Sequence, residues 1–107
     1  MKLITKAIER KLDRHPFGSQ EARGMDAAVL VRFFGGGVCS WLVTEAERDE
    51  SGGWRFFGLA NLGYGWEWGS FDLAELESVE FPPFGLGVER DLYLPAGATV
   101  RDFLKEA

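Results

Sequence analysis

The sequence predicts an α+β fold with one mainly antiparallel sheet of about five strands, an N-terminal helix and one or two short helices. Three observations support this prediction. Short runs rich in β-branched and aromatic residues follow one another after residue 27, glycines separate them, and the gaps between them are too short for crossover helices. A chain of 107 residues lies in the usual size range of one domain, so we expect a single domain over residues 1–107.

The first expected element is an amphipathic helix over residues 4–12. Ile4, Ile8 and Leu12 recur every four residues with basic side chains between them, which is the spacing of a helix with one buried stripe. Thr5 can cap its start. Residues 13–26 contain proline and glycine and show no period, so they predict a loop that returns the chain to the sheet.

Five strands are expected near residues 28–34, 40–46, 54–60, 66–71 and 88–94. Three glycines at 35–37 predict a turn, and they lack the lysine and the following Ser/Thr of a phosphate-binding loop. The expected core includes Ile8, Leu30, Phe57 and Leu76.

Two short helices complete the expected elements. Asp72 and Glu75 have the spacing of a capping box and predict a helix through about Val79. Thr99 offers a weaker cap for a last helical turn. Between these helices, the two prolines in residues 81–85 argue against regular structure there.

The net charge of −5 is distributed unevenly. Residues 1–43 hold seven Lys/Arg against four Asp/Glu, whereas residues 44–94 hold three against eleven. The acidic part is where a cationic partner is attracted and a nucleic acid is repelled. Direct nucleic-acid binding is therefore disfavoured.

The sequence contains no recognisable set of catalytic residues. Cys39 is the only cysteine, which excludes a disulfide or a thiolate metal cluster within one chain, and at the start of a strand it is expected to act as a small hydrophobe. His15 is the only histidine, and beside Pro16 it is expected to be solvated. We predict no cofactor and no metal.

Localisation is expected to be cytoplasmic. The N-terminus lacks the apolar run of a signal peptide. No stretch approaches the roughly 20 apolar residues of a membrane-spanning helix.

Two segments have compositions that suit binding. Trp66 and Trp68 are two residues apart in an expected strand and should share a face, where with Tyr64 they either form a stacking platform or cover the sheet. Packing against the sheet is the favoured alternative. Glu89 and Asp91 should also share a face, either as an ion-paired edge, which is favoured, or as oxygen ligands for a divalent cation.

The chain resembles a bacterial family of small proteins catalogued as a domain of unknown function. The blocks that carry the resemblance occur in the family's order at residues 32–34, 41–45, 56–59, 67–77 and 87–93. The resemblance implies a compact cytoplasmic protein associated with mobile elements, often near antirestriction genes, and it transfers no catalytic residues. Residues 13–26 and 62–66 depart from the family pattern.

From the charge asymmetry and the resemblance, we expect a non-enzymatic acidic binding protein. Its expected role is to inhibit a bacterial defence complex, as an anti-CRISPR or antirestriction protein, through protein–protein contact or partial nucleic-acid mimicry. The alternative is a small metal- or nucleotide-binding, enzyme-like domain that uses Glu89 and Asp91. The predicted partner-binding residues combine acidic and tryptophan side chains: Glu45, Glu47, Asp49, Glu50, Trp66, Trp68, Glu75 and Glu77.

Overall fold

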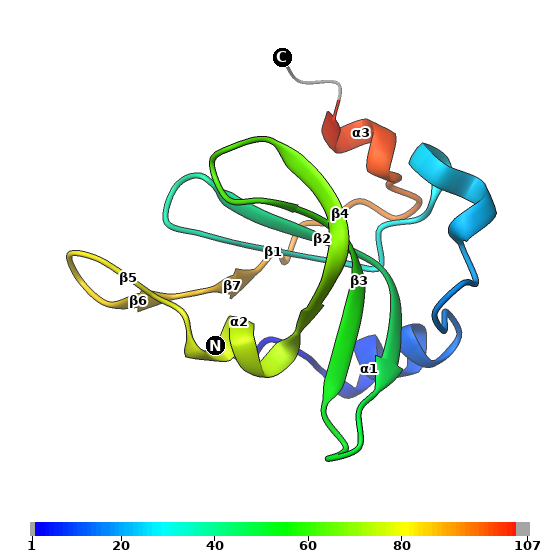
Figure 1. Cartoon of the computed structure of the whole chain (residues 1–107), viewed down its shortest axis with the longest axis horizontal. Coiled ribbons are helices and arrows are strands. Elements are labelled where there is room, and N and C mark those ends of the chain that lie inside the picture. Colours follow the sequence, from blue (N-terminus) through cyan, green and yellow to red (C-terminus); the bar gives the residue numbers. More distant parts are fainter. Residues whose placement is uncertain (1, 105–107) are drawn as a thin grey trace.

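The fold is built on a five-stranded antiparallel sheet in the order β4-β3-β2-β1-β7 (Figure 1). The computed structural model describes residues 2–104. The strands of this sheet are β1 (Val31–Gly35), β2 (Cys39–Arg48), β3 (Trp54–Asn61), β4 (Trp66–Asp72) and β7 (Glu89–Arg90). Helix α1 (Lys6–Asp13) precedes the sheet, α2 (Leu73–Ser78) follows β4, and α3 (Val100–Leu104) lies near the C-terminus. The predicted α+β class is confirmed.

The three helices begin at the caps that the sequence predicts. The Thr5 hydroxyl accepts the Ile8 N–H at 3.2 Å, and the Asp72 N–H donates to the Glu75 carboxylate at 3.2 Å. At α3, the Thr99 N–H donates to the Asp102 carboxylate at 2.9 Å. These bonds satisfy groups that a helix end leaves without partners. Within residues 2–104, none of the helices combines the length and apolarity needed to span a membrane.

Alternation along the strands places one apolar cluster on each face of the sheet. We call the face covered by α1 and α2 the first face, and its core includes Leu12, Val31, Phe33, Trp41, Val43, Trp54, Phe56 and Leu76. The opposite, second face is covered in part by α3 and by a 3₁₀ turn, η1 (Glu21–Asp26), and its core consists of Ala27, Val29, Leu42, Leu59 and Val100. In Figure 1, α3 and the cyan η1 segment lie next to each other, and Arg101 pairs with Asp26 at 3.1 Å.

A β-bulge in β2 changes which residues reach each face. Val43 pairs with Gly58 and Glu45 pairs with Phe57, so Thr44 is the extra residue. The bulge shifts the alternation by one position. Glu45 therefore lies on the second face, and Ala46 joins the core of the first face.

The structure corrects three predictions about local structure. Residues 13–26 contain the 3₁₀ turn η1 and are not a plain loop. In the segment 81–85, Phe81 is the last residue of strand β5 (Glu80–Phe81); residues 82–85 are irregular, as predicted, and connect β5 to β6 (Leu86–Gly87) in a small hairpin. The last strand covers only residues 89–90, because the Asp91 carboxylate accepts the Tyr93 N–H at 2.8 Å and turns the chain away from the sheet.

Two of the four expected core residues are fully buried. Leu30 and Leu76 belong to the first-face core, and Ile8 is half-buried against it. Phe57 is only half-buried and lies on the second face, whereas its neighbour Phe56 is completely buried on the first face. The prediction that Phe57 is a core residue is therefore wrong, and its ring instead lines a surface pocket.

Candidate functional site

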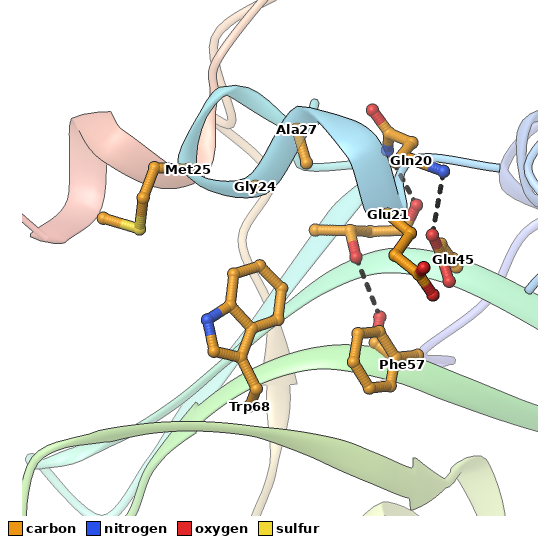
Figure 2. A pocket seen from close by; sticks show the side chains of 9 residues that line it. Gln20, Glu21, Gly24, Met25, Ala27, Glu45, Phe57 and Trp68 are labelled. Carbon is orange, nitrogen blue, oxygen red and sulfur yellow. Dashed lines mark hydrogen bonds between the residues drawn. The ribbon is translucent and has the colours of Figure 1, made fainter. Parts of the chain in front are cut away.

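A pocket of about 250 Å³ lies on the second face, between the sheet and η1 (Figure 2). Its walls come from three strands and from the segment around η1. The lining residues are Gln20, Glu21, Gly24, Met25, Ala27, Thr44, Glu45, Phe57 and Trp68. In Figure 2 the indole of Trp68 stands on one side of the pocket, while the carboxylates of Glu21 and Glu45 lie on the other. We call this the second-face pocket.

Two buried polar side chains build the floor of the pocket. Glu45 is 4% exposed, and its two carboxylate oxygens accept the N–H groups of Gly18 and Gln20, each at 2.8 Å. The Gln20 side-chain amide donates to the carbonyl of Thr44 at 2.7 Å and to that of Ala28 at 2.9 Å, and its oxygen accepts the Ala28 N–H at 2.7 Å. These bonds attach residues 18–28 to β2, so the floor is formed before any ligand binds.

The aromatic wall of the pocket is formed by Phe57 and Trp68. Their rings are stacked, with centroids 5.8 Å apart and an angle of 18° between the ring planes. Phe17 contacts the Phe57 ring from the edge at 6.2 Å. Trp68 remains 44% exposed, so part of its indole is available to a partner.

The pocket continues into a charged row on the same face of the sheet. In the register of the sheet, Glu47 of β2 lies opposite Arg55 of β3, and Arg55 lies opposite Asp72 of β4. The Arg55 Nε–H donates to Asp72 at 3.1 Å, and this bond raises the pKa of Arg55. Together with Glu21 and Glu45, the pocket and this row present four carboxylates and one guanidinium. The local charge is therefore negative and favours a cationic ligand.

The tip of the β2–β3 hairpin is held by one carboxylate. Asp49 accepts the N–H of Ser51 at 2.9 Å, the Ser51 hydroxyl at 2.7 Å and the N–H of Gly53 at 2.8 Å. The hydrogen bond from the Ser51 side chain is the main reason that the pKa of Asp49 is lowered. This carboxylate organises its own turn, while Glu47 and Glu50 are exposed beside it.

This geometry makes a prediction about pH. Because the folded-state pKa of Asp49 is depressed, the stabilisation by its ionised form is complete above the unfolded-state pKa of about 3.9 and is lost as the pH falls through the folded-state value. A carbon-detected NMR titration should place the pKa of Asp49 below that of an aspartate in an unfolded peptide. A normal value would show that the turn does not hold the carboxylate in solution.

The predicted acidic residues do not gather into one surface. Glu45 is buried, which excludes its carboxylate from an exposed docking surface. Glu75 and Glu77 belong to α2, which packs on the first face, and Glu77 borders a hollow together with Lys2 and Lys6. The carboxylates of α2 and of the hairpin therefore lie on different sides of the sheet, with cationic side chains near them.

The two tryptophans share a face, as the sequence predicts, but they differ in burial. Trp66 packs against the second-face core, and Trp68 is the exposed ring at the pocket. Tyr64 is 94% exposed and lines a separate hollow with Ala60 and Glu67. The three rings do not form a continuous platform.

The remaining candidate residues have structural contacts. Asp91 forms an ion pair with Arg32 at 3.2 Å, as in the favoured prediction of an ion-paired edge. Glu89 is exposed. His15 is half-buried rather than solvated, and its Nδ1–H donates to the Lys11 carbonyl at 3.0 Å. Cys39 packs against the first-face core as a small hydrophobe.

Within residues 2–104, no group of three or more His, Cys, Asp or Glu side chains is arranged to hold a metal ion.

Sequence reasoning missed Gln20, Glu21 and Met25 as site residues. They lie in the segment predicted as a loop, and their position over β2 depends on hydrogen bonds to residues more than 20 positions away. The sequence around Glu45 gives no signal of the bulge, because Ala46 takes its place in the core only through the pairing of β2 with β3.

Residues 3–107 match the model of a family described as "Protein of unknown function (DUF2958)". The chain belongs to this family. Because the match includes both the η1 segment and β2–β4, the entire second-face pocket lies within the DUF2958 region. No curated protein and no solved structure matches the chain. The geometry of this DUF2958 protein is therefore the basis for any functional proposal.

Proposed function

We propose that this DUF2958 protein is a non-enzymatic binding protein that docks on a basic surface of a protein partner. The observation that carries the proposal is the open second-face pocket, where the exposed Trp68 lies across from the carboxylates of Glu21 and Glu45. Tryptophan is enriched among the residues that dominate binding energy at interfaces. Negative charge next to such an anchor selects a positively charged partner and speeds encounter.

The proposed docking surface consists of the pocket, the Glu47–Arg55–Asp72 row and the exposed Glu50 at the tip of the hairpin. This is narrower than the predicted acidic surface, because α2 faces another direction and Glu45 is buried. Arg55 lies within the surface, on β3 between Glu47 and Asp72. A cation among the carboxylates favours specific protein contact over imitation of the evenly spaced charges of a nucleic acid.

For the partner, we propose a nucleic-acid-processing complex of a bacterial defence system, which would make the protein an anti-CRISPR or antirestriction factor. Such complexes bind phosphates through grooves rich in Lys and Arg, and an acidic protein with an aromatic anchor fits such a groove. The resemblance to a family associated with mobile elements supports the same setting. The alternative that uses Glu89 and Asp91 is not carried forward, because Arg32 already occupies the Asp91 carboxylate.

The test is binding of the purified protein to purified restriction and CRISPR effector complexes, measured at several salt concentrations. We expect Trp68→Ala and the double variant Glu47→Gln/Glu50→Gln each to weaken binding about tenfold or more. The double variant should also reduce the dependence on salt, since exposed charges are screened over about 10 Å at 0.1 M.

A matched control is Glu67→Gln/Glu89→Gln. It removes the same charge from two exposed residues outside the proposed surface. Glu67 lines the hollow near Tyr64, and Glu89 borders the β5–β6 hairpin. If the control weakens binding as much as the test variant, net charge and not the proposed surface determines docking. If none of the effectors binds, the proposed defence role is wrong.

A further inference from the structure

We propose that the second-face pocket receives a single arginine side chain of the partner, with its guanidinium stacked on the aromatic wall and paired with Glu21. This inference rests on the proposed function and specifies the chemistry of the contact. The size of the pocket, the charges around it and its aromatic wall support an arginine.

The size of the pocket indicates a side chain. Pockets for small-molecule ligands usually measure about 300–1,000 Å³. The second-face pocket, at about 250 Å³, is smaller than this range. One long side chain entering from a partner surface suits this volume better than a nucleotide.

The charges around the pocket indicate a cation. No lysine or arginine lines it, although Glu21 and Glu45 both do. The ion pairs found in residues 2–104 include neither of these carboxylates. Glu45 is a nearly completely buried charge whose hydrogen bonds come only from backbone amides. Burying a carboxylate is costly without a counter-charge, so a cation entering the pocket gains from both carboxylates.

The shape of the aromatic wall favours arginine over lysine. The indole of Trp68 stacks against Phe57 and is still 44% exposed, so its accessible part offers a flat aromatic surface on which a planar guanidinium can stack. The N–H groups at the edge of the guanidinium can then point to the Glu21 carboxylate, which Figure 2 shows across the pocket from Trp68. A lysine ammonium lacks the planar surface needed for stacking.

The experiment uses three blocked amino acids as probes: the N-acetyl, N-methylamide derivatives of arginine, citrulline and lysine. Citrulline has the shape of arginine without its charge. Each probe is titrated into the isotope-labelled protein while the indole Nε1–H signal of Trp68 and the backbone amides of residues 18–28 are followed by NMR. We expect saturable shifts of these signals with arginine, and affinity about tenfold lower for citrulline and for lysine.

Two single variants assign the site. Glu21→Gln should lower the affinity for blocked arginine about fivefold or more, because it removes the charge of an exposed side chain without disturbing a hydrogen bond among the described residues. Glu67→Gln, on the opposite face of β4, should leave it unchanged. Arginine that binds no better than citrulline or lysine, or shifts confined to other residues, would overturn the proposal.

The two proposals fail in different ways. If effector binding depends on Trp68 and the hairpin glutamates but blocked arginine does not bind, the docking surface stands and the arginine assignment is wrong. If blocked arginine binds as expected but effector binding survives Trp68→Ala, the proposed docking on that effector is wrong.

Discussion

Replacing Gly58 with alanine is expected to lower the free energy of unfolding by about 3 kcal/mol or more, the upper part of the range for overpacked sites. Gly58 lies in β3 opposite the bulge of β2, and a Cβ atom there would overlap the carbonyl oxygen of Leu42. The Thr44 nitrogen is also close. Both obstacles belong to the backbone of the neighbouring strand, so relief requires separation of β2 from β3.

The matched control for this prediction is Gly69→Ala. Gly69 pairs with Gly58 across β3 and β4, and a Cβ atom there meets nothing within 4 Å. Alanine at this position should be neutral or slightly stabilising, because glycine in a strand has the larger entropy cost on folding. Urea unfolding of both variants measures the difference. Equal stability of the two variants would show that the strands tolerate a wider separation at the bulge.

Truncation of Glu45 to alanine is expected to cost about 3–5 kcal/mol of unfolding free energy. The change removes the acceptor of two amide groups, Gly18 N–H and Gln20 N–H, and the Gln20 amide is in a buried part of the structure. A buried donor without a partner costs about 1–3 kcal/mol, and hydrogen bonds to charged groups lie at the upper end. The segment over β2 should loosen first, since these bonds attach it to the sheet.

Glu47→Ala is the control, because Glu47 is the next residue on the same face of β2 but is exposed. Its effect should stay within about 0.5 kcal/mol. Thermal unfolding and proteolysis of residues 14–26 separate the two outcomes. If Glu45→Ala unfolds and is cleaved like Glu47→Ala, the carboxylate does not hold the segment in solution.

This role of Glu45 changes how the docking proposal has to be tested. A substitution that includes Glu45 would weaken binding by disturbing the pocket, even if no partner contacts its carboxylate. Glu21, Glu47 and Glu50 are exposed and can be changed with little effect on the fold. Loss of binding in those variants reports on the surface itself.

Local chemistry was sufficient to predict the three helices and the main strands of this fold, but not η1 or the β5–β6 hairpin. Thr5, Asp72 and Thr99 mark the helix starts because their caps act within three residues along the chain. The main strands were recognisable from short β-branched and aromatic runs, and short connections required antiparallel pairing. The sequence also determined that Trp66 and Trp68 share a face, since side chains two apart in a strand point the same way.

Tertiary structure alone decided which of these residues form a site. The bulge at Thr44 depends on the pairing of β2 with β3, and it moved Glu45 from an expected surface position to the buried floor of a pocket. The η1 segment is held there by hydrogen bonds between residues 24 to 27 positions apart. The period of a single strand cannot reveal a bulge, because an extra residue is defined only by the pairing with the neighbouring strand. The pocket that places Glu21 opposite Trp68 was therefore determined by strand register and long-range contacts.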